Sequence, residues 1–514
     1  MQQSLSFKII KNVAWNFIGN GWLIFLMFFT TPYIVRKLDI NLYGVYVLVS
    51  TIIGYFGVLQ LGLIHASIKY ISQYLANDEK DKVRKAFWTC IFMYIIMGTL
   101  GTVIIYSFAG YFVQRFLSMP ENLKGIAVTA IKIGSIGFLF VMITGVINGA
   151  LRALLRFDLL NKIVVFFGTL QLLFTVALLY FGYSLTSIIA SNVILQFLNI
   201  FVYWYYSVKE LPCLAKPTFD APLLLEMLKY GGFISIFSVT EPVLKSSEKI
   251  FLSSLWAVSS LTYYYIPQTI ISRLAIIPSS VLNVLFPVFS RYHEQKESSI
   301  NEELFSRSIL YLQFIYVYIM FFLLFFGKAF FVLWIGNDFA QNSYNVMSVL
   351  AIAGLFNTIS QPSSTLLMGF GRPHTLAFIN VATTVIYLPV SYLAVKHYGP
   401  IGASCAWLFI SVLGFFLLSV AAWQSLRFNI AKMCLNILYR ILPASVFSLL
   451  IYWPLRRFHY PLIHPMTIFG IVLVTGVYFV SIWLWGLDDF ARMRIREFFE
   501  ATVMKFKGLF QRTG

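Results

Sequence analysis

The chain has 514 residues, of which 59% are hydrophobic and only 11% charged, and its mean hydropathy is +0.80. Soluble proteins carry about 25% charged residues, so this composition excludes a soluble globule as well as a disordered, fibrous or disulfide-stapled chain. The net charge of +18 indicates a polytopic membrane protein with basic cytoplasmic loops, not a nucleic-acid-binding protein.

The apolar runs predict an all-α membrane fold, because a helix satisfies its backbone groups internally while it crosses the bilayer. A span requires about 20 mainly apolar residues. Runs of that length predict about fourteen transmembrane helices. Their approximate limits are 13–35, 43–64, 87–108, 126–148, 160–181, 184–206, 230–251, 261–287, 307–326, 343–366, 375–395, 400–423, 439–455 and 465–486.

The distribution of basic residues predicts which loops face the cytoplasm. With the N-terminus placed inside, 26 of the 38 Lys and Arg residues fall on the cytoplasmic side, 8 fall on the outer side and 4 lie within spans. Cytoplasmic loops collect Lys and Arg, so we expect both termini in the cytoplasm. The outer loops are short, the longest lying around 327–342, which leaves little room for an enzymatic domain.

The last segment, residues 488–514, interleaves basic with apolar side chains. Arg496 and Lys505, for example, flank Phe498 and Phe499. We expect an amphipathic helix that lies on the anionic inner leaflet. The alternative is a solvated basic tail that only follows the positive-inside rule.

A weak internal repeat divides the chain. Leu42-Tyr-Gly-Val-Tyr46 follows the first span, and Leu261-Thr-Tyr-Tyr-Tyr265 opens the eighth, at an offset of 219 residues. Two units of six spans predict parallel lobes with the substrate site between them, although a shared rhythm of helices and loops is an alternative explanation. The predicted boundaries are 1–206 for the N-lobe, 207–228 for a cytoplasmic linker, 229–424 for the C-lobe, 425–487 for two further spans and 488–514 for the tail.

Six ionisable residues lie inside predicted spans, where a charge is costly and normally faces a cavity or a partner. Four of them fall on the seventh span within a stripe about 100° wide, so one face of this helix is polar. Pro242 lies beside the stripe and removes a backbone hydrogen bond. We expect a water-filled, net cationic cavity. The six residues are Lys132, Glu241, Lys245, Glu248, Lys249 and Arg273.

The four bases are candidates for binding an anionic substrate group, because an anion crosses hydrocarbon only when protein groups replace its water. These substrate-binding candidates are Lys132, Lys245, Lys249 and Arg273. The two acids, Glu241 and Glu248, are candidates for coupling or for positioning the bases. In the alternative interpretation Glu241 only pairs with Lys245 at i,i+4 and Lys249 reaches toward the interface.

No motif in the sequence indicates a metal, a cofactor or a catalytic residue. The six histidines form no ligand-spaced pair, and a phosphate-binding Walker A motif is absent. The four cysteines are scattered without a CxxC pair. We therefore expect transport without ATP hydrolysis by this chain, with a proton or sodium gradient as the energy source to test.

Several stretches along the chain resemble one family. They are Asn12-Val-Ala-Trp-Asn16, Leu38-Asp-Ile-Asn-Leu-Tyr-Gly-Val-Tyr46, Leu59-Gln-Leu-Gly-Leu63, Met368-Gly-Phe-Gly-Arg-Pro373 and Tyr398-Gly-Pro-Ile-Gly-Ala403. With these stretches the chain resembles the polysaccharide (O-antigen type) flippases of the multidrug/oligosaccharidyl-lipid/polysaccharide (MOP) exporter superfamily. The resemblance extends over nearly the whole chain, and these stretches are signatures of the fold more than of a catalytic site.

The resemblance implies two six-helix lobes in a V around a central cavity, as in multidrug (MATE) transporters, with two extra C-terminal helices. It implies a protein of the inner or plasma membrane that acts in polysaccharide or lipopolysaccharide biosynthesis. The implied substrate is an oligosaccharide on a polyprenyl diphosphate, moved from the inner to the outer leaflet. Membrane lipids, a glycan polymerase and glycosyltransferases are the implied partners, and nucleic acid is not.

Three other functions compete with this one. A peptidoglycan-precursor (lipid II) flippase shares the fold and the diphosphate chemistry. A cation-coupled multidrug exporter predicts an acidic cavity, whereas the spans contain two acids among four bases. An enzyme such as a membrane polymerase or ligase requires a large outer loop with clustered Asp, His or Arg, which the short outer loops do not provide.

Overall fold

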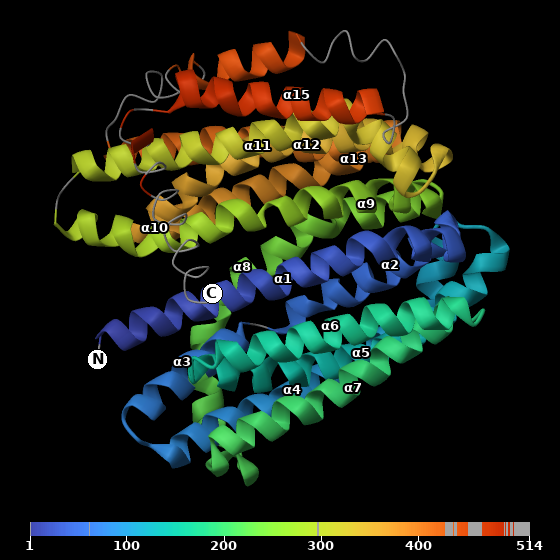
Figure 1. The fold of residues 1–514 in the computed structure, drawn as a ribbon. Coiled ribbons are helices and arrows are strands. Elements are labelled where there is room, and N and C mark those ends of the chain that lie inside the picture. Colours follow the sequence, from blue (N-terminus) through green and yellow to red (C-terminus); the bar gives the residue numbers. More distant parts are fainter. Residues whose placement is uncertain are drawn as a thin grey trace, which may run out of the picture. The chain divides into compact units, whose positions relative to one another are not determined.

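The computed structural model describes residues 2–60, 62–295, 298–426, 439–450 and 465–487, with five single positions between 435 and 497. Within these residues the chain consists of helices and the turns that join them, and no strand occurs (Figure 1). The predicted all-α fold is confirmed. The predicted amphipathic tail at 488–514 falls almost entirely outside the described residues.

Long helices follow one another with short connections, as expected for a chain that crosses a membrane repeatedly. The first half contains α1 Gln2–Leu38, α2 Ile40–Tyr55, η1 Phe56–Gln60, α3 Leu63–Ala76, α4 Lys80–Phe116, α5 Glu121–Ala153, α6 Phe157–Tyr180 and α7 Leu185–Glu210. The second half contains η2 Pro212–Ala215, α8 Ala221–Leu255, α9 Val258–Leu274, α10 Ile276–Glu294, α11 Ser298–Trp334, α12 Asn337–Gly369, α13 Pro373–Leu426, α15 Pro465–Ser481 and η3 Ile482–Gly486.

Each predicted span lies mainly in helix where the structure describes it. By length and apolar composition alone, seven described helices qualify as spans, or eight when α1 and α2, bent by 116° at Asp39, count as one. These helices confirm a multi-pass membrane protein, while the count of fourteen stays a prediction. Of the other predicted spans, the one at 261–287 is divided between α9 and α10. Helix α13 merges two helices across Gly399, which has φ 56°.

The second span of each half is interrupted partway along. In the first half, α2 passes into the 3₁₀ segment η1, and Gly62 at φ 63° precedes α3. Glycine adopts this left-handed conformation without the steric cost that other residues meet. In the second half, α9 ends at Leu274 and α10 begins at Ile276. Such interruptions leave backbone groups without helical partners, which membrane proteins tolerate only where protein or water satisfies them.

Two compact units make up the chain. The first comprises residues 1–269 and 380–407, and the second comprises 270–379 and 408–514. None of the borders between the two units falls within the predicted linker at 207–228. The predicted lobe boundaries stay a prediction.

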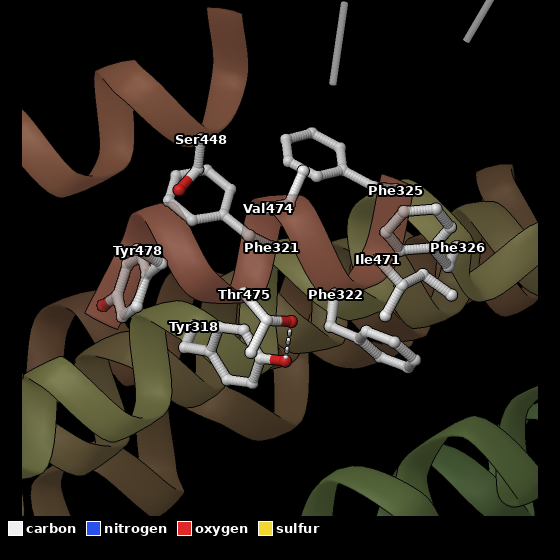
Figure 2. A pocket seen from close by; sticks show the side chains of 10 residues that line it. All are labelled: Tyr318, Phe321, Phe322, Phe325, Phe326, Ser448, Ile471, Val474, Thr475 and Tyr478. Atoms are coloured by element: carbon white, nitrogen blue, oxygen red, sulfur yellow. Dashed lines mark hydrogen bonds between the residues drawn. The ribbon is translucent and has the colours of Figure 1, made fainter. Parts of the chain in front are cut away.

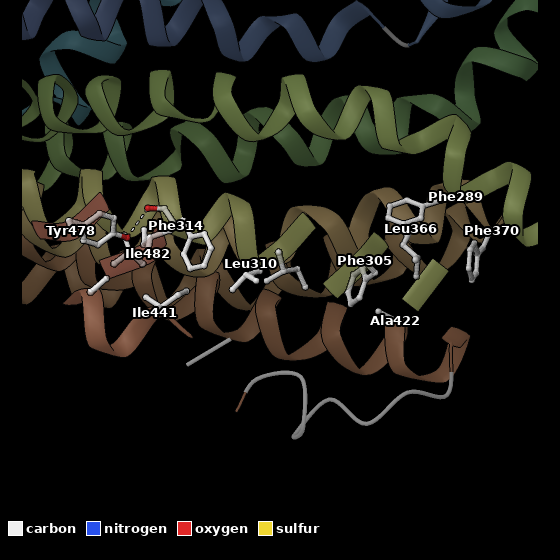
Figure 3. Close-up of a cluster of buried hydrophobic side chains, with 13 residues drawn as sticks. Phe289, Phe305, Leu310, Phe314, Leu366, Phe370, Ala422, Ile441, Tyr478 and Ile482 are labelled. Carbon is white, nitrogen blue, oxygen red and sulfur yellow. Dashed lines mark hydrogen bonds between the residues drawn. The ribbon is translucent and has the colours of Figure 1, made fainter. Parts of the chain in front are cut away.

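The second unit contains a continuous hydrophobic core (Figure 3). Its side chains come from α10, α11, α12, α13 and α15 and include the fully buried Phe289, Phe305 and Leu366. Tyr478 on α15 donates a hydrogen bond from its hydroxyl to the carbonyl of Phe314 on α11 at 2.7 Å. This bond satisfies the one polar group that the buried tyrosine brings into the core.

In the first unit, α8 packs against α2, α3 and α4. At one end of α8 the Asp220 carboxylate lies 3.3 Å from the Lys85 ammonium. At the other end Ser118 donates from its backbone N–H to the Ser253 carbonyl and from its hydroxyl to the Ser254 carbonyl, at 2.9 and 2.7 Å. The seventh span is therefore anchored at both ends to the first half of the chain, at one end to α4 and at the other to the connection between α4 and α5.

The same region requires a glycine at position 44. A Cβ atom added to Gly44 on α2 would lie 2.3 Å from the carbonyl oxygen of Val258, at the start of α9. Nearby, the Thr262 hydroxyl donates to the Ile40 carbonyl at 2.7 Å. The absence of a side chain on Gly44 thus allows the backbones of α2 and α9 to approach closely.

Candidate substrate and coupling site

Helix α8, which carries four of the predicted site residues, begins with Asp220 as its N-cap. The Leu223 N–H donates to the Asp220 carboxylate at 3.0 Å, and a proline follows in the first turn of α8. This backbone hydrogen bond, helped by the Lys85 ammonium, lowers the pKa of Asp220 below its usual range. Pro242 lies inside α8 without ending the helix.

Glu248 is the centre of a buried polar cluster. Its side chain is fully buried. One carboxylate oxygen, Oε1, accepts from the Tyr264 hydroxyl at 3.2 Å and from the Gln268 Nε2 at 2.9 Å. The other oxygen, Oε2, accepts from the Tyr387 hydroxyl at 3.1 Å. Three neutral donors thus hold one carboxylate in place without an arginine or lysine hydrogen bond among these contacts.

Three helices of the first unit contribute to this cluster. Tyr264 and Gln268 lie one turn apart on α9, so their side chains share a face. Tyr387 comes from α13, more than a hundred residues further along the chain, and its ring packs edge to face against Trp407 at 5.9 Å. Tyr264 and Tyr387 are both fully buried. A charge here is protected from water and oriented by rigid neighbours, the conditions under which electrostatic interactions are strongest.

Lys249 follows Glu248 directly and is half-buried. Its Nζ lies 5.3 Å from the ring centre of Tyr265, within the range of a cation–π contact. The ammonium therefore stays beside the Glu248 cluster and close to an aromatic ring. The role of Lys249 in substrate binding stays a prediction.

Lys132, the predicted base on the fourth span, has a different neighbour. It lies on α5 and is half-buried, and its Nζ is 5.0 Å from the ring centre of Tyr106 on α4. The contact joins two adjacent helices of the first half. Its role in substrate binding stays a prediction.

Glu241, Lys245 and Arg273 complete the predicted set. Glu241 and Lys245 lie within α8, on either side of Val243, and their side chains fall outside the described part of the structure. Arg273 is exposed in the last turn of α9, immediately before the interruption at Ala275. Because Arg273 belongs to the second compact unit and Lys249 to the first, the meeting of these bases around one headgroup stays a prediction.

Sequence analysis missed the three donors around Glu248. Tyr264 and Gln268 carried a weak signal, since two polar side chains at i,i+4 inside an apolar run form a polar patch. Tyr387 carried none, because a single tyrosine in a membrane helix is unremarkable and only the path of α13 brings it to α8. A long-range contact of this kind is decided by tertiary packing.

A second polar stripe was also missed, because only ionisable residues were considered inside spans. Asn192, Gln196 and Asn199 follow one another at i,i+4,i+7 on α7, which places them on one face. Among the residues that the structure describes, the buried side-chain oxygens of Gln196 and Asn199 have no hydrogen-bond partner. The Gln196 oxygen lies where a Cβ on Gly137 of α5 would clash, at 2.7 Å.

The second unit contains a small, mostly aromatic pocket between α11, α15 and the helix at 439–450 (Figure 2). Its polar groups are few, and two of them satisfy each other, since the Tyr318 and Thr475 hydroxyls lie 2.8 Å apart. The lining residues are Tyr318, Phe321, Phe322, Phe325, Phe326, Ser448, Ile471, Val474, Thr475 and Tyr478. No charged side chain lines it, so it does not belong to the predicted headgroup site.

Comparisons with known proteins identify relatives over most of the chain. A candidate O-antigen transporter of Shigella flexneri is 22% identical over 400 residues, which cover 78% of this chain and 94% of that protein. An uncharacterised membrane protein of Methanocaldococcus jannaschii is 21% identical over 445 residues, covering 80% and 82% of the two chains.

Solved structures show the same fold. The lipid II flippase MurJ in an inward closed conformation matches with a TM-score of 0.70 at 14% identity, over 93% of this chain and 99% of that one. An inward-facing multidrug resistance transporter of the MATE family and MOP superfamily matches with a TM-score of 0.66 at 13% identity, over 81% and 95%.

The family model described as "Polysaccharide biosynthesis protein" matches residues 34–344, more than half of the chain. The Shigella flexneri relative and the two solved structures are named as transporters or flippases, and none of these three is named as an enzyme. The chain therefore belongs to the polysaccharide biosynthesis protein family, and its fold is that of the solved MurJ and MATE transporter structures.

Proposed function

We propose that this flippase moves a polyprenyl-diphosphate-linked oligosaccharide from the inner to the outer leaflet by alternating access through a cationic cavity. The observation that carries the proposal is the group of ionisable residues on α8 and α9, inside helices of a family that handles polysaccharides. Within the described cluster Glu248 is fully buried and Lys249 stays beside Tyr265. A charged group is kept inside a membrane helix only where it has a task or a partner.

The bases on α8 and α9 would replace the water around the diphosphate. Lys245 and Lys249 offer compact ammonium groups, while Arg273 offers a planar fork that binds two phosphate oxygens at once. These charge-assisted hydrogen bonds are stronger than those between neutral groups. The headgroup would therefore cross the membrane interior with its charge balanced, while the polyprenyl chain stays in lipid.

Glu248 is the proposed coupling group, with Glu241 as the second acid of the same helix. The donors of Tyr264, Gln268 and Tyr387 stabilise the ionised carboxylate, and the low dielectric around it opposes the charge. A proton or a sodium ion that binds Glu248 would change this balance and the position of Lys249 beside it. Uptake and release of that ion would bias the helix between two arrangements.

The membrane, the orientation and the partners follow from the same proposal. A protein that collects a cytoplasmic lipid-linked glycan would lie in the inner or plasma membrane with both termini in the cytoplasm. Glycosyltransferases would supply its substrate on one side, and a glycan polymerase would take the product on the other. Labelling of introduced cysteines at Asn337 and Arg456 from the outer side tests this orientation, and labelling of both from the inside would reverse it.

A strain without this protein tests the function. We expect lipid-linked repeat units to accumulate, unpolymerised, on the inner leaflet. Normal surface glycan in that strain, without a redundant flippase, would remove the proposal. The lipid II alternative, which the MurJ fold favours, predicts arrest of peptidoglycan synthesis instead, and a multidrug exporter predicts sensitivity to cationic drugs with normal glycan.

A further inference from the structure

Tyrosines and lysines gather at the end of α3 and the beginning of α8, beside the charged segment at 77–85. The Lys69 Nζ on α3 lies 3.7 Å from the ring centre of Tyr230 on α8 and 5.3 Å from that of Tyr70. The Tyr70 and Tyr230 rings meet edge to face at 6.3 Å. Tyr74, one turn further along α3, continues the row with its ring 6.0 Å from Tyr70. One ammonium is therefore held between aromatic rings from two helices.

This cluster is exposed and presents an ammonium group beside aromatic rings. Lys69 is exposed, and Tyr230 keeps 37% of its surface accessible. Lys82 lies 5.6 Å from the Tyr74 ring but also pairs with the Glu79 carboxylate at 2.9 Å. Among the described residues Lys69 forms no such close carboxylate pair, and its ammonium lies against the faces of two rings. An incoming anion would find this ammonium already positioned.

An interfacial aromatic belt does not account for the arrangement. Belt tyrosines place their rings at the membrane surface, among lipid headgroups. Tyr70 and Tyr230 instead meet edge to face across the contact between α3 and α8. Both helices belong to the first unit (Figure 1). The cluster also combines rings and ammonium groups with an exposed carboxylate, Glu226, that interacts electrostatically with Tyr70.

This combination of groups matches a sugar phosphate. The C–H face of a pyranose ring packs on an aromatic ring, and its hydroxyls bond to phenol and carboxylate oxygens. The phosphate pairs with an ammonium group in a charge-assisted hydrogen bond. A few convergent polar groups on an apolar platform are also the usual composition of small-ligand sites.

We propose that Lys69, Tyr70 and Tyr230 form a receiving site for the sugar-phosphate headgroup of the lipid-linked glycan. The inference rests on the proposed function and adds a site that is distinct from the Glu248 cluster. Tyr230 and Glu248 are separated along α8 by a rise of about 27 Å at 1.5 Å per residue. The headgroup would bind first at this end of α8 and then pass along the helix to the bases of the predicted cavity.

The test uses the full chain in lipid nanodiscs and measures the binding of soluble probes by calorimetry. The probes are glucose, galactose and N-acetylglucosamine 1-phosphates, the corresponding free sugars, and inorganic phosphate. We expect Lys69→Gln to weaken sugar-phosphate and phosphate binding about tenfold. Tyr230→Leu should weaken sugar-phosphate binding about fivefold and leave phosphate binding unchanged, whereas Tyr230→Phe should resemble the wild type.

Matched controls exist on α7, where Lys209 and Tyr205 are also exposed. Lys209→Gln and Tyr205→Leu should leave the binding of all probes unchanged. Lys69→Arg should restore most of the affinity that Lys69→Gln loses. Thermal unfolding of every variant identifies those that lose binding only because they are misfolded.

Three results would overturn the inference. The first is no detectable sugar-phosphate binding by the wild-type protein. The second is wild-type affinity for the sugar phosphates in both the Lys69→Gln and the Tyr230→Leu variants. The third is inorganic phosphate bound as tightly as the sugar phosphates. The last would identify a general anion or lipid-phosphate site. Because these measurements use isolated protein, they are separate from the export defect that tests the function. Normal export in a strain without the protein would contradict the function even if the sugar phosphates bind.

Discussion

The two halves of the chain share a backbone plan but differ in their buried charges. In the first half the second span is interrupted between α2 and α3, and in the second half its counterpart is interrupted between α9 and α10. The correspondence extends further along the chain, since α5 ends at Ala153 and α12 ends at Gly369, close to the same offset of 219 residues. The path of the backbone is therefore similar in both halves.

The side chains at corresponding positions have different chemistry. Glu248 and Lys249 on α8 correspond to Phe29 and Thr30 on α1. Phe29 is 60% exposed, and the Thr30 hydroxyl donates to the Leu26 carbonyl within its own helix. Both halves are therefore helical at these positions. The positions that carry charged side chains in the second half carry apolar or neutral side chains in the first half.

This difference indicates which properties the repeat constrains. Interrupted helices at similar positions let both halves bend, whereas five of the six ionisable residues inside predicted spans lie in the second half and only Lys132 lies in the first. The donors around Glu248 come from α9 and α13, and α8 also packs against first-half helices in the same compact unit. A charge on α8 is therefore placed where helices from both halves of the chain surround it.

The largest expected effect comes from removing the bases of the second half. Arg273→Ala or Lys245→Ala should reduce glycan export at least tenfold while the protein still inserts, because the diphosphate loses a charged partner. Arg273→Lys should retain part of the activity, less if two-point binding matters. Export assays in a complemented null strain measure this effect. The matched control is the first-half counterpart Leu26→Ala, and full export by all the basic variants would show that these charges only pair or snorkel.

The next effect in size concerns the Glu248 cluster. Glu248→Ala leaves three buried donors without an acceptor and should lower the free energy of unfolding by about 3 kcal/mol. Glu248→Gln keeps the shape and should slow turnover more than it weakens substrate binding. Phe29→Ala, at the corresponding first-half position, should lower the free energy of unfolding less, because the Phe29 side chain is exposed. Thermal unfolding with a binding assay measures both quantities, and equal stability of the Ala and Gln variants would contradict the role of the three donors.

A smaller effect tests the contact between α2 and α9. Gly44→Ala places a Cβ 2.3 Å from the Val258 carbonyl oxygen, a backbone atom that moves only with its helix. We expect a loss of about 1–3 kcal/mol in the free energy of unfolding. Gly54→Ala on the same helix meets no atom within 4 Å and should be neutral or stabilising by under about 1 kcal/mol. If the two variants unfold at the same temperature, the close approach of α2 and α9 is not important for stability.

The smallest effect concerns the N-cap of α8. The pKa of Asp220 is lowered by the Leu223 N–H and by Lys85, so its stabilising contribution is present above the unfolded-state pKa, about 3.9. That contribution is lost as the pH falls through the lower folded-state pKa. The protection of first-turn amides of α8 against hydrogen exchange, relative to their intrinsic rates at each pH, should fall in this acidic window, whereas Asp220→Ala should show low protection at every pH. Unchanged wild-type protection across this window would exclude the cap as the cause.

Much of the fold could be predicted because it depends on local composition. Apolar runs and the exclusion of unpaired backbone from lipid require helices, and the 3.6-residue period placed Glu248 and Lys249 on one stripe of α8. The interruptions at Gly62 and Ala275 were not predicted, since apolar residues continue through both. Whether a helix is interrupted at these positions depends on contacts with other helices, and the hydropathy of the segment itself contains no information on those contacts.

The sequence by itself determined that this is a polytopic helical membrane protein with charges concentrated on one helix, because hydropathy and helical periodicity are properties of short segments. Only the tertiary structure decided that Glu248 accepts from Tyr264, Gln268 and Tyr387. These donors come from two other helices, and Tyr387 is 139 residues away. Likewise, only packing between α3 and α8 brings Lys69 to Tyr230. A hydrogen bond or cation–π contact requires a separation of a few ångströms, and for residues far apart in the chain that separation is set by how the helices pack.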